Sequence, residues 1–382
     1  MAKAGTLTTL YTFMNGTDGG NPVGVLSYDH GALYGTTSVG NGNVFKIDAA
    51  TGDFKVVHSF QGGADGALPY HGVVYAGGML YGTTEAGGGS SCTLNYPKGC
   101  GTIFSIDPKT DAEAVLYEFP RSVNGTENVE PGSLLYLAGT LYGITKGGGT
   151  YGNGSVFSFN PTSASFTTLY SFTGGADGND PNPQLLYENS LLYGATSYGG
   201  TGCAAHHLSG CGTIFTVNPA TGVETVLYAF KYGKTGKIPY SNFIYHAGWL
   251  TGDTLIGGDR QSCRNGCGVN FKVKVATGRE TLINTFTNRG ESYSGMTQAQ
   301  GAVYGTLPYG GSGYGALAQL DLTSGQQTVL YTFTGGADGR YPQEALTYHD
   351  GVLYGTTLSG ADQGNPGCLA NEGCGTVFKF VP

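Results

Sequence analysis

The segment Leu33–Thr37 reads LYGTT, and close variants of it recur along the whole chain. Their shared glycine stands at Gly35, Gly82, Gly143, Gly194, Gly252, Gly305 and Gly355, in steps of 47, 61, 51, 58, 53 and 50 residues. Seven repeats of about fifty residues are typical of the blades of a β-propeller.

Each repeat contains four segments with strand character. In chain order these are an apolar segment ending near Tyr (Val23–Tyr28), the LYGTT segment, a GTVF segment (Gly375–Phe380) and an LYxF segment (Leu330–Phe333). Apolar and polar residues alternate in them between Gly, Asp and Pro clusters, which favours strands, and no window has a helical period.

The two ends of the chain carry complementary parts of one repeat. The last GTVF segment runs to Pro382 without an LYxF segment after it, while Thr6–Phe13 supplies TLTTLYTF at the start. We therefore predict an all-β fold, a seven-bladed β-propeller with four-stranded blades. It forms a single domain over residues 1–382, and the N-terminal strand completes the last blade and closes the ring.

Composition excludes several classes of protein. The chain has 69 Gly in 382 residues, 12% charged residues and a net charge of −8. A nucleic-acid-binding protein would carry a basic surface, so we expect no nucleic-acid partner. No apolar stretch is long enough to span a membrane.

The eight cysteines fall into four close pairs. These are Cys92/Cys100, Cys203/Cys211, Cys263/Cys267 and Cys368/Cys374. Close, even pairing predicts disulfides and an oxidising compartment. Zinc binding is the alternative, but the gaps are longer and less regular than those of zinc sites. We expect a secreted or cell-envelope protein, and since the chain starts without a signal peptide, an exported form would have lost it.

LYGTTxxGG followed by GTVFxI resembles the GloVer tandem-repeat family of bacterial envelope and secreted proteins, over essentially the whole chain. The resemblance implies an exported bacterial protein and supplies no activity or catalytic residue. The fifth repeat (LTGDT, GVNF) and the sixth (VYGTL, GALA) depart from the pattern.

A GxDGxxP motif lies in the crossovers between repeats, at Asp18, Asp65, Asp177 and Asp338. We interpret each Asp as an acceptor of backbone hydrogen bonds in a turn. Structural calcium is the alternative, although one Asp per site is few for an ion that takes six to eight oxygens. No cofactor is otherwise indicated. The crossovers share one face of a propeller with the long loops that hold the cysteines, and we predict function there.

Polar and aromatic residues enter the innermost strands near the predicted mouth of the central channel. We single out as candidate catalytic residues Tyr70, His71, Tyr240, Tyr293 and Glu344. Candidate ligand-binding residues are Asn182, Asn242, Arg289 and Arg340, with Trp249 and Arg260 from the irregular fifth repeat. Such side chains suit a sugar, whose rings stack on aromatics and whose hydroxyls bond to amides and carboxylates. Lining of a water-filled channel, and drift of one repeat, are the alternatives.

Three functions remain open. The first is recognition of an extracellular polysaccharide by a monomeric protein, favoured because no standard catalytic motif is present. The second is a polysaccharide lyase using Tyr or His with Arg, or a glycosidase pairing Glu344 with Asp338 or Asp65. The third is a protein-interaction scaffold, which rests on the fold alone.

Overall fold

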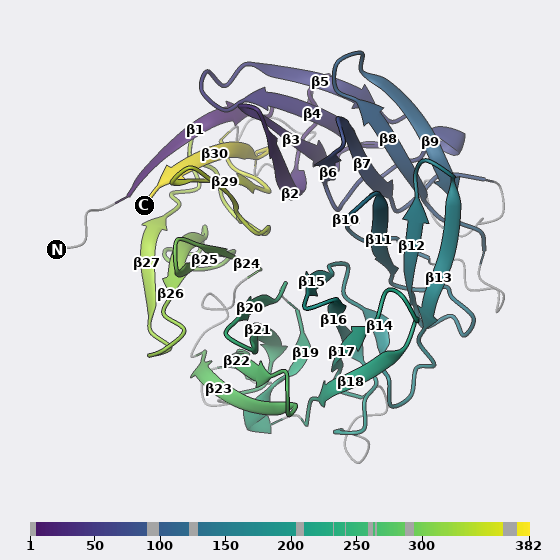
Figure 1. Cartoon of the computed structure of the whole chain (residues 1–382). Coiled ribbons are helices and arrows are strands. Elements are labelled where there is room, and N and C mark those ends of the chain that lie inside the picture. The colour runs from purple at the N-terminus through teal and green to yellow at the C-terminus, as the bar shows by residue number, and fades with distance from the viewer. Residues whose placement is uncertain are drawn as a thin grey trace. The chain divides into compact units, whose positions relative to one another are not determined.

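The computed structural model describes residues 5–89, 99–121, 129–203, 210–231, 233–240, 242–258, 263, 266–286, 294–361 and 373–382. The regular secondary structure of these residues is almost entirely β-strand, joined by turns and loops (Figure 1). The helices among them are two single 3-10 turns in crossovers, η1 (Gly63–Asp65) and η2 (Gly233–Thr235). No helix in this part of the chain has the length and hydropathy needed to cross a membrane.

The strands form seven antiparallel sheets, which are the blades of a seven-bladed β-propeller, as predicted. Blade 1 contains β2 (Pro22–Asp29), β3 (Ala32–Thr37), β4 (Asn43–Asp48) and β5 (Phe54–Ser59). Blade 2 contains β6 (Val73–Ala76), β7 (Met79–Thr84), β8 (Thr102–Asp107) and β9 (Ala112–Glu118). Blade 3 contains β10 (Leu135–Leu137), β11 (Thr140–Thr145), β12 (Ser155–Asn160) and β13 (Ser165–Ser171).

Blades 4 and 5 have a broken first strand, whose two pieces both pair with the second strand. Blade 4 contains β14 (Asn179–Pro181), β15 (Leu186–Glu188), β16 (Leu191–Tyr198), β17 (Thr213–Val217) and β18 (Glu224–Ala229). Blade 5 contains β19 (Lys237–Pro239), β20 (Ile244–His246), β21 (Trp249–Ile256), β22 (Val269–Lys274) and β23 (Arg279–Thr285). Blade 6 contains β24 (Gly295–Ala299), β25 (Ala302–Leu307), β26 (Ala316–Leu320) and β27 (Gln327–Thr332).

The seventh blade joins the two ends of the chain. It contains β28 (Thr347–His349), β29 (Val352–Thr357), β30 (Thr376–Val381) and, as its fourth strand, β1 (Thr6–Thr12). The antiparallel register pairs Thr6 with Val381 and Thr12 with Thr376. The N-terminal strand therefore completes the last blade, as the split repeat predicted.

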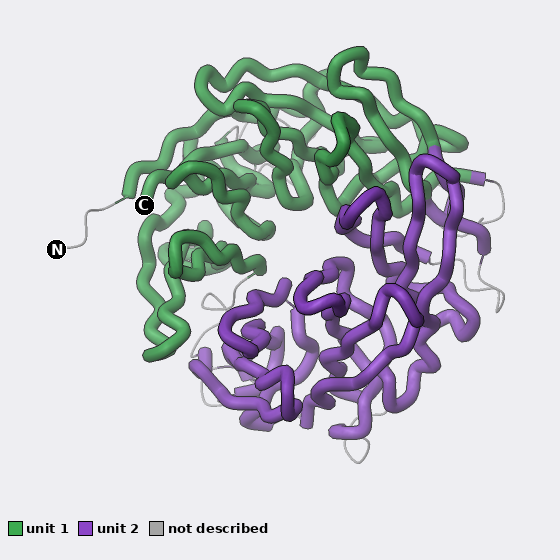
Figure 2. The backbone as a smooth tube through the Cα atoms, viewed as in Figure 1, with its two compact units in different colours: residues 1–88, 102–115, 293–382 green, residues 89–101, 116–292 purple. Residues whose placement is uncertain are grey.

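The chain divides into two compact units (Figure 2). The first comprises Met1–Gly88, Thr102–Val115 and Tyr293–Pro382, and it holds blades 1, 6 and 7 with most of blade 2. The second comprises Gly89–Gly101 and Leu116–Ser292, with blades 3, 4 and 5. Each unit has its own buried apolar clusters. A single domain over the whole chain stays a prediction.

The repeated glycine faces the phenylalanine of the neighbouring GTVF strand. A Cβ atom built on Gly143 would lie 2.4 Å from Cζ of Phe157, and one on Gly194 would lie 2.5 Å from Cζ of Phe215. Register pairs each glycine with that phenylalanine. The glycine of LYGTT is thus required because the ring occupies the space of a side chain, and not because of its backbone angles.

The same phenylalanine also receives the ring that ends the preceding blade. Phe60, after β5, meets Phe104 edge-on at 5.1 Å between centroids, and Phe172, after β13, meets Phe215 at 4.9 Å. All four rings are at most 4% exposed. These aromatic pairs link consecutive blades in each unit, and each contributes about 0.5–1.5 kcal/mol beyond its buried area.

The second Thr of LYGTT is buried and bonds to the first residue of the GTVF strand. Thr84 and Thr102 have their hydroxyl oxygens 2.8 Å apart, and Thr196 and Thr213 are 2.9 Å apart. In blade 3 the hydroxyl of Thr145 lies 2.8 Å from that of Ser155. The hydroxyl pair satisfies polar groups that would otherwise be buried alone, which explains why the motif keeps this threonine.

Two predicted disulfides lie wholly within the described residues. Cys203–Cys211 and Cys263–Cys267 have Cα atoms 5.6 and 5.4 Å apart. Cys100 and Cys374 are each disulfide-bonded, and their predicted partners Cys92 and Cys368 lie outside the described residues. Closed loops this short contribute roughly 2–3 kcal/mol in the chain-entropy model, so the bridges fix loops more than they hold the fold.

We expect Gly143→Ala to destabilise the protein by roughly 1–3 kcal/mol, because the new methyl group must displace the buried Phe157 ring. Urea unfolding of the purified variant measures this difference. The matched control is Gly175→Ala, where the added atom meets nothing closer than 3.4 Å. Equal stability of the two variants would contradict the role given to the motif glycine.

Candidate functional site

His71 lies just before β6, where a crossover is pinned to the end of β7. Ala67 and Ala86 exchange two backbone hydrogen bonds of 2.8 and 3.0 Å. This pairing brings Nε2 of His71 to 3.1 Å from Oε1 of Glu85, the residue directly after the LYGTT segment of blade 2. Their side chains are 19% and 23% exposed, so the pair is half-buried yet accessible.

A second carboxylate approaches His71 from blade 7. Glu344 precedes β28, and its carboxylate accepts a hydrogen bond from the backbone N–H of Gly24 in β2. Burial raises the pKa of Glu344, while the charge of His71 and the Gly24 hydrogen bond oppose the rise. The first unit thus gathers an imidazole and two carboxylates where the inner strands of blades 1, 2 and 7 approach one another.

The backbone permits this close approach only because two glycines meet there. Gly24 and Gly72 both have positive φ, of 73° and 74°, and a Cβ on Gly24 would lie 2.2 Å from the backbone nitrogen of Gly72. Val25 and Gly72 also form a parallel bridge. The inner strands of blades 1 and 2 are therefore in direct backbone contact beside His71.

Tyr70 completes this group. Its ring is half-buried, and burial first, then the charge of Glu85, raises the pKa of its hydroxyl. Tyr70, His71, Glu85 and Glu344 are called the His71 cluster below. The structure thus brings together three of the five predicted catalytic residues and adds Glu85. Glu85 was not predicted from the sequence. The one available signal was that this repeat has an acidic residue directly after LYGTT, where the other repeats have Ser, Leu, Lys or Pro.

In the second unit Asn182 and Tyr240 lie near each other. Nδ2 of Asn182 donates to the backbone oxygen of Pro239 at 2.5 Å, and its Oδ1 accepts from Ser197 at 2.9 Å. The amide thus serves contacts between blades 4 and 5. Tyr240 is 53% exposed, and Asn242 is partly exposed. Of these predicted residues Tyr240 is the most exposed.

Trp249 and Arg340 have local partners. Trp249 begins β21 at its hairpin with β20, so it lies at the opposite end of β21 from the long loop that follows. Nζ of Lys272 and of Lys274 lie 5.2 and 5.0 Å from its ring centre.

Arg340 donates through Nε to Ser359 at 3.2 Å. The remaining candidates, Tyr293, Arg289 and Arg260, lie outside the described residues.

The crossover aspartates make the predicted turn hydrogen bonds. Asp177 accepts from Tyr170 at 2.9 Å and from the N–H and hydroxyl of Thr173 at 2.7 and 2.6 Å. Asp338 accepts from Tyr331 at 2.9 Å and from Thr334 in the same way. The carboxylate of Asp338, considered above as a partner of Glu344, is thus occupied by its own turn.

Blade 5 buries an acid where most blades bury a threonine, and an amide where the other blades bury an apolar residue. Asp253 and Asn270 occupy paired positions in β21 and β22, and both are 0% exposed. Neither side-chain atom of Asn270 has a hydrogen-bond partner among the described residues. The irregular LTGDT and GVNF motifs therefore change the interior of the blade as well as its loops.

The residue six positions before the phenylalanine that ends each blade lies on the fourth strand, where that strand contacts the neighbouring blade. Phe54 stacks on Tyr11 with 4.0 Å between ring centres, and Phe166 stacks on Tyr117 with 4.3 Å. In blade 4 the same position is Glu224, whose Oε1 is buried and has no hydrogen-bond partner in the part of the chain that the structure describes. Burial, followed by the nearby Asp177, raises the pKa of Glu224 to about 7.

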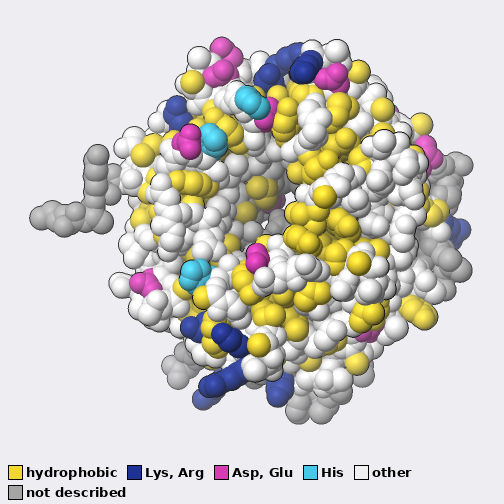
Figure 3. All heavy atoms as spheres, viewed as in Figure 1, with side chains coloured by type: hydrophobic (Ala, Val, Ile, Leu, Met, Phe, Trp, Pro, Cys, Tyr) yellow, Lys and Arg dark blue, Asp and Glu magenta, His cyan; other side chains and the backbone are white. Residues whose placement is uncertain are grey.

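The face shown in Figure 3 has few charged side chains, and uncharged polar and apolar side chains cover most of it. This agrees with a composition of only 12% charged residues. A ligand on such a surface would be recognised mainly through uncharged polar and aromatic groups.

Residues 93–263 match the model of the Gloeobacter/Verrucomicrobia repeat family. The match confirms the predicted resemblance to this repeat family. No curated protein matches the chain in sequence.

Solved structures share the fold at low identity. An oligogalacturonate lyase from Vibrio parahaemolyticus is 11% identical, with 98% of this chain and 93% of that chain covered and a TM-score of 0.59. An oligogalacturonate lyase in complex with manganese is also 11% identical, with 100% and 98% covered and a TM-score of 0.57. A chain of the mitotic checkpoint complex is 11% identical, with 98% and 90% covered and a TM-score of 0.56. Proteins so different show the fold and leave the activity open.

We expect Glu224→Gln to stabilise the protein more at about pH 8 than at about pH 5. The raised pKa means that the folded state holds the proton more tightly than the unfolded state, so wild-type stability falls as pH rises from about 4.5 through 7. The amide removes that loss, with a gain of roughly 1–3 kcal/mol at the higher pH after allowance for solvent screening.

Denaturant unfolding of wild type and variant at the two pH values measures this gain. The control is Glu118→Gln, which changes an exposed carboxylate at the end of β9 and should show no such difference. A gain at residue 224 that is independent of pH would contradict the assignment.

Proposed function

We propose that this protein recognises an extracellular polysaccharide through the His71 cluster. The carrying observation is the half-buried imidazole of His71, which lies 3.1 Å from the Glu85 carboxylate and interacts electrostatically with Glu344, with the half-buried Tyr70 near Glu85. Sugar hydroxyls donate to carboxylates and accept from an imidazole N–H, and a sugar ring packs on an aromatic face. The two lyases of the same fold named above agree with a carbohydrate-related role.

The charges of the cluster favour a neutral sugar. Two carboxylates surround one imidazole, and the whole chain carries a net charge of −8. A uronic acid would be repelled unless a cation faced it, and Arg340 already donates to Ser359. The disulfides fit export to an oxidising compartment, where such a polysaccharide would be met.

Cleavage of the polysaccharide at the same cluster is the second candidate. Burial raises the pKa of Glu344, as a general acid requires, and Glu85 supplies the second carboxylate that a glycosidase needs. A lyase would instead use His71 or Tyr70 to move protons, and it is supported by the likeness to the two oligogalacturonate lyases.

We expect the wild-type protein to be retarded in native gels containing a neutral polysaccharide, and His71→Gln to weaken this binding roughly tenfold, because a hydrogen bond to the sugar is lost. The matched control is His30→Gln, which alters an exposed histidine in the β2–β3 turn and should bind normally. Thermal unfolding verifies that both variants fold.

A panel of neutral and uronic-acid polysaccharides, assayed also for reducing ends and for the ultraviolet absorbance of unsaturated products, separates the candidates. Retention without either product supports recognition alone. Reducing ends without absorbance indicate a hydrolase, and absorbance indicates a lyase. Binding that is unaffected by His71→Gln, or no binding to any member, would contradict the proposed site.

A further inference from the structure

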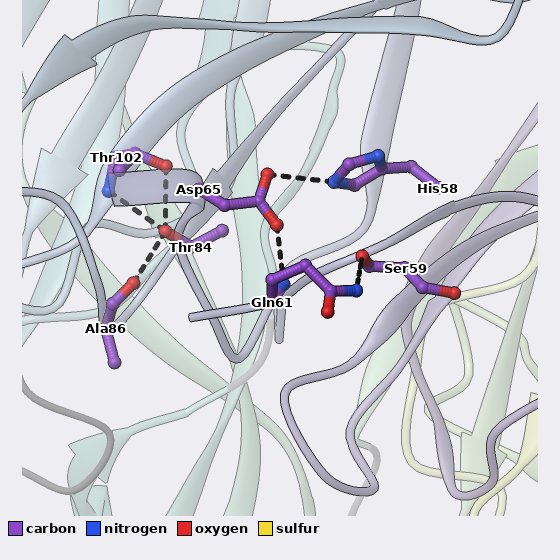
Figure 4. Close-up of polar contacts among 7 residues, drawn as sticks. All are labelled: His58, Ser59, Gln61, Asp65, Thr84, Ala86 and Thr102. Atoms are coloured by element: carbon purple, nitrogen blue, oxygen red, sulfur yellow. Dashed lines mark hydrogen bonds and ion pairs between the residues drawn. The ribbon is translucent and has the colours of Figure 1, made fainter. Parts of the chain in front are cut away.

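A second cluster of ionisable side chains lies on the outermost strands of blades 1 and 2, apart from the inner strands that carry the His71 cluster. His58 is on β5, Asp65 ends the 3-10 turn η1 of the following crossover, and Glu113 is on β9. Nε2 of His58 lies 3.0 Å from Oδ1 of Asp65. Figure 4 shows the imidazole directed at that carboxylate, whose second oxygen accepts the N–H of Gln61.

Five other repeats place a phenol where blade 1 places this imidazole, and blade 5 has Asn284 there. Tyr11 donates to Asp18 at 3.1 Å, Tyr170 to Asp177 at 2.9 Å, and Tyr331 to Asp338 at 2.9 Å, each seven residues ahead of its aspartate. His58 stands at the same spacing from Asp65. A neutral imidazole is a good metal ligand, whereas a protonated phenol is a poor one, so the substitution changes what the site can bind.

Glu113 occupies the inter-blade position that Phe54 and Phe166 fill with stacked rings elsewhere. Its Oε1 is buried and has no hydrogen-bond partner among the described residues. Burial first, then the charge of Asp65, raises the pKa of Glu113 to about 7. No Lys or Arg in the described ranges forms an ion pair with Asp65 or Glu113. The carboxylates therefore face each other and His58 without a compensating cation.

We propose that His58, Asp65 and Glu113 bind one divalent transition-metal ion, such as Zn²⁺, between blades 1 and 2. One ligand atom from each residue lies within 4.8 Å of the other two. Ligands at about 2.1 Å from an ion are themselves roughly 3–3.5 Å apart, so the 3.0 Å pair already fits and the widest pair must close by roughly 1–2 Å. One nitrogen and two oxygens suit Zn²⁺ or Mn²⁺ better than Ca²⁺, which prefers oxygens alone.

The surroundings support ligation. The Gln61 N–H holds the second oxygen of Asp65 at 2.5 Å and so orients the carboxylate. All three side chains keep partial exposure, which leaves a path for the ion and room for water as a further ligand. The ion would neutralise two carboxylates and link β5 to β9, so its expected role is to stabilise the contact between the blades.

The test uses the full-length, tag-free protein after removal of metals with a chelator. Calorimetric titration with Zn²⁺, and separately with Mn²⁺, should show one equivalent bound and a higher unfolding temperature in the bound form. His58→Tyr introduces the residue that five other repeats have at this position and keeps a donor for Asp65, so this variant should fold and lose the binding. Glu113→Gln should weaken it at least tenfold.

Two controls keep the result specific. His30→Gln alters another histidine–aspartate pair, in which His30 Nδ1 lies 2.6 Å from Asp29. No third His, Cys, Asp or Glu among the described residues joins that pair, so this variant should bind as wild type does. Replacing His206 and His207 by Ala removes the adjacent histidines from the chain and should also leave binding intact. Absence of binding by either ion, equal affinity in His58→Tyr, or loss of binding only in the His206/His207 variant would overturn the proposal.

Discussion

The packing of one phenylalanine determines much of this structure. The ring from each regular GTVF strand lies on the glycine of LYGTT within its own sheet, and it receives the terminal ring of the preceding blade edge-on. Any side chain at the glycine would push the ring away from both contacts. The motif pair is thus one packing unit split between two strands, and its repetition connects successive blades within each unit. In blade 6, where the third strand has Ala318 opposite Gly305, the unit is reduced to two small residues.

This packing leaves the edges of the blades free to vary. At the inner edge, Gly24 and Gly72 let the inner strands of blades 1 and 2 approach closely. His71, next to Gly72, and Glu344, which accepts the Gly24 N–H, lie near each other there. At the outer edge, the position beside the crossover aspartate is filled by a stacked ring in two blades and by a glutamate in blades 2, 4 and 5. Function can therefore differ between repeats while the core stays the same.

Both clusters rely on buried or half-buried carboxylates whose charges are poorly compensated. The Glu344 carboxylate accepts a backbone N–H and lies near His71, whereas one oxygen of Glu113 has no hydrogen-bond partner among the described residues. A buried carboxylate is tolerated when it is neutral or when a cation meets it. Sugar hydroxyls at the inner cluster and a metal ion at the outer one would each supply what these groups lack.

The sequence by itself determined the architecture. Seven spaced glycines, the GTVF partner strand and the split repeat at Thr6–Phe13 predicted the blades and the pairing of β1 with β30, because these features depend on local strand patterns and on the count of repeats. It also singled out His71, Tyr70 and Glu344. Only the tertiary structure decided which side chains meet. Glu85 lies 14 residues from His71, and Glu113 lies 55 residues from His58, on strands whose neighbours are set by blade packing. A repeat pattern records what each blade shares, whereas these contacts arise from the residues in which adjacent blades differ.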